Sequence, residues 1–143
     1  MYRRTGDRDF LTTARRLADF ALRALGPDHV PVWDHRAPQQ PYDIKDASAG
    51  AIMACGLLDL AAATGRTSYR DVALRLLTAL AETCLTRNSA SAEAVVARCT
   101  RNRPAEDGIE ISLPYADCYL LEGNLRVLRP HDVDRAIDLS TTP

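Results

Sequence analysis

The sequence predicts an all-α fold in which helical hairpins form an incomplete part of a toroid. Three observations lead to this prediction. Apolar residues recur at helical spacing in the segments 7–25, 68–85 and 114–128. A fourth segment, 49–64, contains a single charged residue. A repeat of 59 residues relates the first part of the chain to the second. Along the chain, helices with one polar face alternate with apolar helices. This alternation is expected where outer helices surround inner ones.

The first predicted helix, 7–25, is amphipathic. Its apolar residues follow the i, i+3, i+4, i+7 spacing, and arginines and aspartates occupy the opposite face. The inward-facing residues are Phe10, Leu11, Ala14, Leu17, Ala18, Ala21 and Leu25. Gly26 and Pro27 end the helix, because glycine adopts a left-handed cap and proline cannot continue the hydrogen-bond ladder.

A long irregular connection, 27–46, follows and contains four prolines. Loops of about twenty residues inside a compact domain are uncommon and usually functional. At its end, Asp46 or Ser48 can cap a new helix. That helix, 49–64, has Asp59 as its one charged residue, so we expect it to be buried on all sides.

The second amphipathic helix, 68–85, repeats the first. Its inward-facing residues are Tyr69, Val72, Ala73, Leu76, Leu77, Leu80 and Cys84. Placing Thr64-Gly65 on Thr5-Gly6 aligns the two helices at a constant spacing of 59 residues. In the second copy this pair ends the buried helix, so we expect residues 1–6 to be the last turn of another inner helix whose body precedes residue 1.

The last part of the chain contains a polar loop, 86–112, for which the sequence predicts no definite structure. A fourth helix begins near Pro114, which is tolerated in a first turn, and its apolar stripe continues to Leu128. The segment 130–143 has little periodicity, so we expect it to be mobile or loosely docked.

The composition is that of one globular domain: 143 residues, 46% of them apolar, with a net charge of −1. Seventeen arginines and Lys45 are scattered among nineteen acids, which favours neither nucleic acid nor an anionic membrane as a partner. No apolar run approaches the length of a membrane span and the N-terminus lacks a signal-peptide core, so a cytoplasmic location is expected. The four cysteines, Cys55, Cys84, Cys99 and Cys118, form no CxxC pair, so we expect reduced core thiols and no metal or other cofactor.

The candidate functional residues lie where the predicted inner helices begin. Trp33 either stacks on a sugar ring or fills the core of its loop. Lys45 and Asp46 either point toward an anionic or hydroxylated ligand, or form a helix cap with its neighbour in solvent. Tyr115 and Asp117 are either pocket residues, or a core tyrosine and an acid favoured by the helix dipole.

No constellation of these residues identifies a catalytic centre. Glycoside hydrolysis needs two carboxylates across a bond, and no spacing rule links the loop acids Asp34, Asp43, Asp46 and Asp117. His29 and His35 share the long loop without a nearby serine or cysteine nucleophile, so a triad is not expected.

Three stretches carry a resemblance to a known family: VPVWDHRAP at 30–38, KDASAGAIMACGLLDL at 45–60, and RCTRNRP leading into SLPYADCYLLEGNLRVL at 98–128. In their order and spacing they resemble the C-terminal part of the unsaturated glucuronyl hydrolases, glycoside hydrolase family 88. The unsaturated rhamnogalacturonyl hydrolases are a more distant match. The resemblance implies that residues 1–128 are the C-terminal part of an (α/α)6 barrel and that 129–143 form a tail.

The resemblance also implies a chemistry. The family hydrates the Δ4,5 double bond of the unsaturated uronic acid that polysaccharide lyases leave at the non-reducing end: an aspartic acid protonates C4, water adds at C5, and the resulting hemiketal opens to release the next sugar. Six hairpins of 59 residues need about 350 residues, and the family's catalytic aspartates lie in the half that has no counterpart here. No catalytic residue carries over, so we expect the chain to be inactive alone.

The positions that match are on the pocket side of the family. They are Trp33 and Asp34 of its WD, Asp46 and Ser48 of its DSSA, and Tyr115, Asp117 and Tyr119 of its YGDYY. The implied partner is an unsaturated uronyl oligosaccharide. The chain departs from the family where HGT reads RCT at 98–100 and where Cys118 and Ala116 interrupt the last motif. A non-catalytic α-hairpin module that binds a partner or itself through exposed inner helices, or a decayed fragment, is the alternative.

Overall fold

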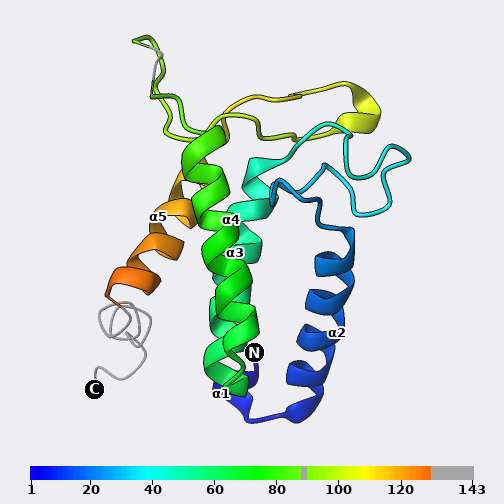
Figure 1. The fold of residues 1–143 in the computed structure, drawn as a ribbon, viewed down its shortest axis with the longest axis vertical. Helices are drawn as coiled ribbons and strands as arrows, with labels where there is room; N and C mark the ends of the chain where they lie inside the picture. Colours follow the sequence, from blue (N-terminus) through cyan, green and yellow to red (C-terminus); the bar gives the residue numbers. More distant parts are fainter. Residues whose placement is uncertain (88–89, 130–143) are drawn as a thin grey trace.

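The computed structural model describes residues 1–87 and 90–129, and over these residues the all-α prediction is confirmed. The α-helices are α1 (Tyr2–Thr5), α2 (Arg8–Ala24), α3 (Ala47–Thr64), α4 (Thr67–Thr83) and α5 (Pro114–Leu128), with a 3-10 turn, η1, at Arg103–Ala105. Extended pairing among the described residues is limited to isolated bridges in the loops. The helix α3 packs against α4 and α5, and α2 lies on its other side (Figure 1).

The 59-residue repeat is confirmed in the geometry of the helices. Helices α2 and α4 each have 17 residues. The first residue of α4 lies 59 positions after the first residue of α2, and the same spacing separates their last residues. α1 and α3 end at Thr5 and Thr64, and each is followed by a glycine in the left-handed region, with φ 71° at Gly6 and 69° at Gly65. Each threonine hydroxyl donates to the carbonyl four residues earlier, at 3.2 Å and 2.6 Å. The two helix ends are therefore equivalent turns of one repeated unit.

The helix α3 begins two residues earlier than predicted because Asp46 caps it. The Asp46 carboxylate accepts the Ser48 backbone N–H at 3.0 Å, so the helix includes Ala47 and Ser48. Asp7 caps α2 in the same way through the Asp9 N–H at 2.9 Å.

The core lies where α3, α4 and α5 meet. Leu76 and Leu80 of α4 are fully buried. A Cβ atom built on Gly50 of α3 would lie 3.3 Å from a methyl group of Leu80, so these two helices approach closely at the glycine. The predicted inward face of α4 is therefore correct.

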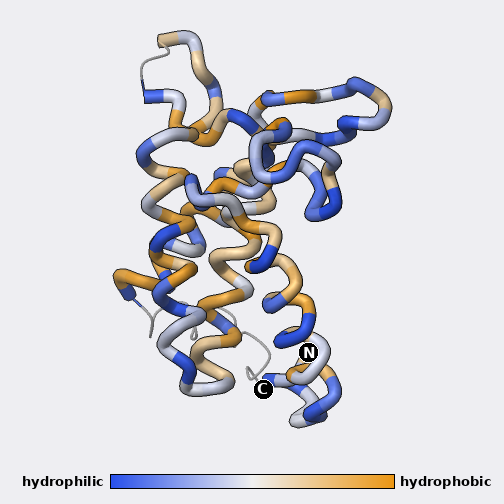
Figure 2. Tube along the Cα trace, turned by 45° about the vertical axis from the view of Figure 1, so that its right-hand side comes forward, coloured by the Kyte–Doolittle hydropathy of each residue, from blue (hydrophilic) through white to orange (hydrophobic). Residues whose placement is uncertain are grey.

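The prediction that α3 is buried on all sides is wrong. The helix is apolar along nearly its whole length (Figure 2), yet Ile52 is 42% exposed and Gly56 is also exposed. The reason is that α4 and α5 cover two sides, whereas α2 contributes only partly buried residues. The apolar face predicted for α2 is likewise only half covered, since Leu17 is 64% exposed.

In length and composition α3 would also pass as a membrane span. It has 18 residues and a mean hydropathy of 1.5, so the expectation that no segment approaches a span was wrong by this criterion. A core helix of a globular protein passes the same test, and the contacts of α3 with α4 and α5 account for the apolar residues on the two sides that these helices cover. The segment 130–143, which was expected to be mobile or loosely docked, lies outside the described residues. Of the predicted tail 129–143, the structure describes Arg129 alone.

Candidate functional site

The predicted site residues lie at one end of the helical bundle. α3 and α5 both start there, beside the two long connections 25–46 and 84–113 (Figure 1). The N-terminus of each helix carries partial positive charge and unpaired amide groups, which favour acidic or hydroxyl side chains nearby.

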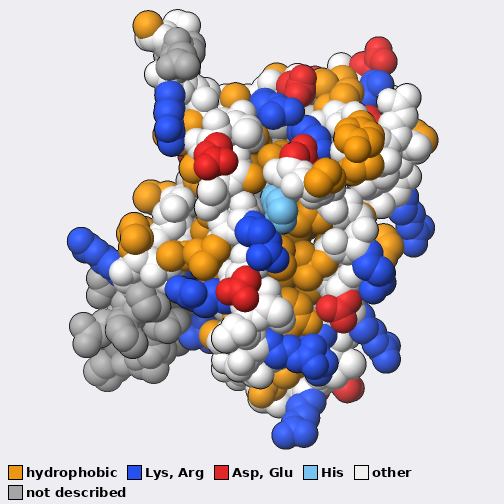
Figure 3. All heavy atoms as spheres, viewed as in Figure 1, with side chains coloured by type: hydrophobic (Ala, Val, Ile, Leu, Met, Phe, Trp, Pro, Cys, Tyr) orange, Lys and Arg blue, Asp and Glu red, His pale blue; other side chains and the backbone are white. Residues whose placement is uncertain are grey.

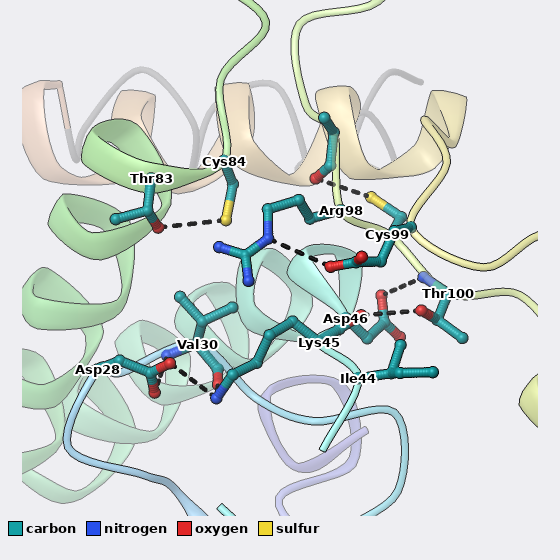
Figure 4. Close-up of polar contacts among 12 residues, drawn as sticks. Asp28, Val30, Ile44, Lys45, Asp46, Thr83, Cys84, Arg98, Cys99 and Thr100 are labelled. Atoms are coloured by element: carbon teal, nitrogen blue, oxygen red, sulfur yellow. Dashed lines mark hydrogen bonds and ion pairs between the residues drawn. The ribbon is translucent and has the colours of Figure 1, made fainter. Parts of the chain in front are cut away.

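Lys45 holds the first long loop together. Its Nζ atom forms an ion pair with Asp28 at 2.7 Å (Figure 4). It also donates to the carbonyl oxygens of Val30 at 3.1 Å and Pro41 at 2.9 Å. The residue is only 8% exposed. Lys45 is therefore neither a solvated neighbour of the cap nor directed at a ligand: all three partners belong to its own loop.

Asp46 combines a helix cap with a link to the second long loop. Its Oδ1 atom accepts the Ser48 N–H at 3.0 Å, the Ser48 hydroxyl at 2.6 Å and the Thr100 N–H at 3.2 Å. The Thr100 hydroxyl in turn donates to the Lys45 carbonyl at 2.8 Å (Figure 4). Ser48 is buried beneath this arrangement.

Asp117 occupies the first turn of α5 and holds the same loop from the other side. Its Oδ2 atom accepts the Val95 N–H at 3.1 Å, and its Oδ1 atom accepts the Val96 N–H at 2.8 Å. The segment 95–100 therefore bridges the start of α5 and the start of α3, where the Arg98 carbonyl accepts the Ala47 N–H at 2.9 Å. Three of the predicted residues, Asp46, Ser48 and Asp117, are joined through this segment.

Trp33 and Asp34 stay within the first long loop. The Trp33 backbone N–H donates to the Ile44 carbonyl at 2.9 Å, next to the bridge between Val32 and Lys45. Its indole Nε1 is buried and has no hydrogen-bond acceptor among the residues that the structure describes. Asp34 is exposed and accepts the Arg36 N–H at 2.6 Å, which stabilises a turn.

Tyr115 and Tyr119 leave part of their rings in solvent. Tyr115 is 43% exposed, so it is not the buried core tyrosine that was one of its two interpretations, and Tyr119 is 36% exposed. The Tyr119 carbonyl accepts a bond from the Cys55 thiol at 3.3 Å, which ties the start of α5 to α3.

Sequence reasoning did not predict the hairpin that carries Thr100. Its two sides are joined by an isolated bridge in which Cys99 and Ile111 exchange N–H···O bonds of 2.8 Å, and Arg98, at φ 58°, turns the chain before Cys99. The sequence did give one signal at this position: residues 98–100 read RCT where the resembled family has HGT. These residues contact the start of α3 directly.

Of the four cysteines, Cys55, Cys84 and Cys99 are buried as expected, whereas Cys118 is exposed. All four are free thiols. Burial raises the pKa of Cys55 and of Cys99 from 9.0 to about 11, because the low-dielectric surroundings disfavour the thiolate. Within 1–87 and 90–129 no group of histidine, cysteine and acidic residues is arranged to hold a metal ion.

Among the residues that the structure describes, three of the cavities lie away from these residues, and none of the seven predicted site residues lines them. One of about 320 Å³ lies near the C-terminal end of α3 and contains Arg3, Arg66, Arg70, Arg126 and Asp59. One of about 430 Å³ lies between the end of α2 and the first loop. The third, of about 340 Å³, is an apolar groove between α1, α2 and α3. On the face shown in Figure 3, basic and acidic side chains are interspersed.

Two curated relatives of this chain are both unsaturated glucuronyl hydrolases. No protein-family model matches the chain. The chain is 35% identical over 132 residues to the unsaturated glucuronyl hydrolase of Bacillus sp. strain GL1, a match that covers 87% of this chain and 34% of that protein. It is 32% identical over 124 residues to the unsaturated glucuronyl hydrolase of Formosa agariphila, covering 85% of this chain and 31% of that protein.

The fold agrees with the sequence. The crystal structure of the Bacillus sp. GL1 enzyme matches with a TM-score of 0.83 and 33% identity, over 90% of this chain and 36% of that one. The predicted fold class, part of a helical toroid, is confirmed by this match. This chain is therefore homologous to the unsaturated glucuronyl hydrolases over about a third of their length.

Proposed function

We propose that this chain supplies the C-terminal part of a family 88-type unsaturated glucuronyl hydrolase, which hydrates the Δ4,5-unsaturated uronic acid at the non-reducing end of lyase-derived oligosaccharides. The observation that carries the proposal is the agreement of sequence and fold with the Bacillus sp. GL1 enzyme, which is described as responsible for the degradation of glycosaminoglycan. Because the chain spans about a third of such an enzyme, its own contribution is to the walls of the pocket.

The contacts of the two aspartates favour a shaping role. Asp46 and Asp117 each accept backbone amides at the start of an inner helix, so their carboxylates position the segment 95–100. A general acid must be free to give its proton to the substrate, whereas Oδ1 of Asp46 and both carboxylate oxygens of Asp117 already accept hydrogen bonds from the chain itself. Trp33, Tyr115 and Tyr119 would supply the partly exposed aromatic surface on which a sugar ring stacks.

An absorbance assay tests the catalytic part of the proposal. Hydration removes the double bond of an unsaturated uronyl disaccharide and with it the ultraviolet absorbance. Purified chain alone should leave this absorbance unchanged, because it has no counterpart of the catalytic aspartates. Co-expression with the part of the Bacillus sp. GL1 enzyme outside the matched third should restore a steady loss. Loss of absorbance with the chain alone, or a properly assembled complex that stays inactive, would contradict the proposal.

The binding part can be followed through Trp33, which is the only tryptophan in the sequence. In the assembled complex, its fluorescence should change on titration with a non-hydrolysed unsaturated uronyl sugar, and Asp34→Asn should leave that response in place if Asp34 only closes its turn. A cytoplasmic location stays a prediction.

A second candidate function is a non-catalytic α-hairpin module that associates with itself or another protein. The exposure of apolar side chains favours it: Leu17 is 64%, Leu121 62% and Leu128 75% exposed. Exposed apolar patches promote association. Light scattering should then give a mass above that of the 15.7 kDa monomer, whereas a stable monomer at high concentration argues against self-association.

A further inference from the structure

A cavity of about 320 Å³ opens where α3 ends and α4 begins, at the end of the bundle opposite the long loops (Figure 1). Four arginines and one acid line it together with apolar residues of α3. The charged residues are Arg3, Arg66, Arg70, Arg126 and Asp59. A cavity of this volume is large enough for a small organic molecule. Its lining carries an excess of positive charge.

The single charged residue of α3, Asp59, brings two of these arginines together. Its Oδ1 atom accepts hydrogen bonds from Arg126 at 2.6 Å and from Arg3 at 3.3 Å. Arg126 also pairs with Glu122 of its own helix at 2.6 Å, and its side chain is only 12% exposed. Two guanidinium groups are therefore balanced by two carboxylates and are held in place by them.

The other two arginines, Arg66 and Arg70, are not balanced. Within residues 1–87 and 90–129, neither side chain forms an ion pair or a hydrogen bond. The repeat places Arg66 at the position where Asp7 caps α2, yet Arg66 provides no cap for α4, and the first turn of α4 contains no acid. Two positive side chains thus adjoin a helix end that is itself positive, an arrangement that favours an anion.

The charge and the composition of the lining indicate the class of ligand. The two unpaired guanidinium groups match the charge of a phosphate monoester, which is about −2 at neutral pH. Arginine can pair with phosphate oxygens through two parallel N–H···O bonds. Leu58, Ala61 and Ala62 form an apolar side of the cavity, which can contact the organic part of such a ligand.

We propose that this cavity binds a small soluble phosphate monoester. Arg66 and Arg70 contact the phosphate oxygens, and Arg126, positioned by Asp59, faces the ligand from α5. None of the seven predicted site residues lines the cavity, so this inference does not depend on the proposed hydrolase activity.

Isothermal titration calorimetry of the full-length chain with glucose 6-phosphate tests the proposal. Arg66→Gln and Arg70→Gln should each weaken binding about tenfold or more, because each removes a charge-assisted contact. Arg75→Gln removes the same charge from an exposed position of α4 outside the cavity, and it should leave binding nearly unchanged. No binding by the wild-type chain, or equal weakening by Arg70→Gln and Arg75→Gln, would overturn the proposal.

The melting temperatures without ligand check the variants themselves. Arg66→Gln should melt no lower than the wild type, because it removes a positive charge from the positive end of α4. A clear fall would show that the Arg66 side chain has a structural partner, and it would contradict the unbalanced charge on which the proposal rests.

Two further probes at equal ionic strength identify the ligand. Glucose 6-sulfate carries one negative charge on the same sugar, so it should bind more weakly than the phosphate; equal binding would overturn the assignment to a phosphate monoester. Vesicles that contain phosphatidic acid present a phosphate monoester on a membrane. Binding to these vesicles without binding of glucose 6-phosphate would identify a lipid headgroup and overturn the soluble ligand. Neither result bears on the ultraviolet assay, so the site and the proposed hydrolase can fail separately.

Discussion

The two inner-helix glycines, Gly56 and Gly123, should respond in opposite ways to substitution by alanine. Alanine in a helix interior is favoured over glycine by about 0.5–1 kcal/mol, because glycine loses more backbone entropy on folding. At Gly56 the added methyl group meets nothing within 4 Å, so the unbound chain should become more stable by about that amount. For a chain of this size, this corresponds to a rise in melting temperature of about 3 °C.

At Gly123 the same gain is opposed by a clash. The new Cβ atom would lie 2.9 Å from the Cδ2 atom of Leu77, and Leu77 is only 6% exposed, so its side chain has little room to move. Overpacking of this kind costs about 1–3 kcal/mol. Gly123→Ala should therefore be less stable than Gly56→Ala by roughly 1–3 kcal/mol.

Urea denaturation followed by circular dichroism measures both free energies of unfolding, and Trp33 fluorescence gives a second probe of the transition. Coincident transitions are needed before the two values are compared. If Gly123→Ala stabilises the chain as much as Gly56→Ala does, α5 is not in close contact with α3 and α4, and the reasoning about the open position on α3 fails with it.

Four further outcomes follow, two from the contacts at the loop end and two from the burial of the cysteine thiols. Lys45→Met removes the ion pair and two hydrogen bonds that hold the first loop, and it should lower the free energy of unfolding by about 2–3 kcal/mol, measured in urea; a loss below 0.5 kcal/mol would contradict the loop-holding role. Asp117→Asn keeps only one of two acceptor oxygens for the amides of the segment 95–100, and should cost about 1–2 kcal/mol while increasing hydrogen exchange there; unchanged exchange would count against it. Cys118 should react first with a thiol reagent at pH 8, whereas Cys55 and Cys99, whose pKa values of about 11 keep them neutral, should react only after unfolding. Because both pKa values are raised in the folded chain, stability should be retained below pH 9 and should fall as the pH rises from 9 toward 11, where the unfolded chain loses these protons first; a flat profile there would argue against burial of these thiols.

The helices were predictable because the signals that form them are local. Gly65 ends α3 after Thr64 in the predicted left-handed conformation. The left-handed cap predicted at Gly26 is wrong, because α2 ends at Ala24 and its cap is Leu25 in an extended conformation. The start of α3 moved from 49 to Ala47 because either Asp46 or Ser48 could have been the cap, and the carboxylate also bonds to Thr100, which is 54 residues away. Such a distant partner leaves no periodic signal in the sequence.

The site was predictable in its location and much less in its contacts. The positions of Asp46 and Asp117 at helix starts follow from capping and dipole preferences. Both carboxylates bind one loop segment, 95–100. This arrangement depends on how the hairpin between Cys99 and Ile111 folds back, and no spacing rule predicts that fold. Lys45 was read as a solvated or ligand-directed cation because lysines are seldom buried, and only the three-dimensional arrangement of Asp28, Val30 and Pro41 reveals its partners.

The wrong prediction that α3 is buried on all sides is informative about the surfaces that the structure leaves exposed. A helix surface in lasting contact with water tends to carry polar residues, and one in contact with protein tends to carry apolar or small residues. The exposed side of α3 presents Ile52 and Gly56, and the facing side of α2 presents Phe10 and Leu17. The composition of these surfaces is that of a covered interface, although the described residues leave them open. The repeat makes the contrast specific: Tyr69 and Leu76 of α4, the residues equivalent to Phe10 and Leu17, are buried, and the helix that packs most extensively against α4 is the apolar α3.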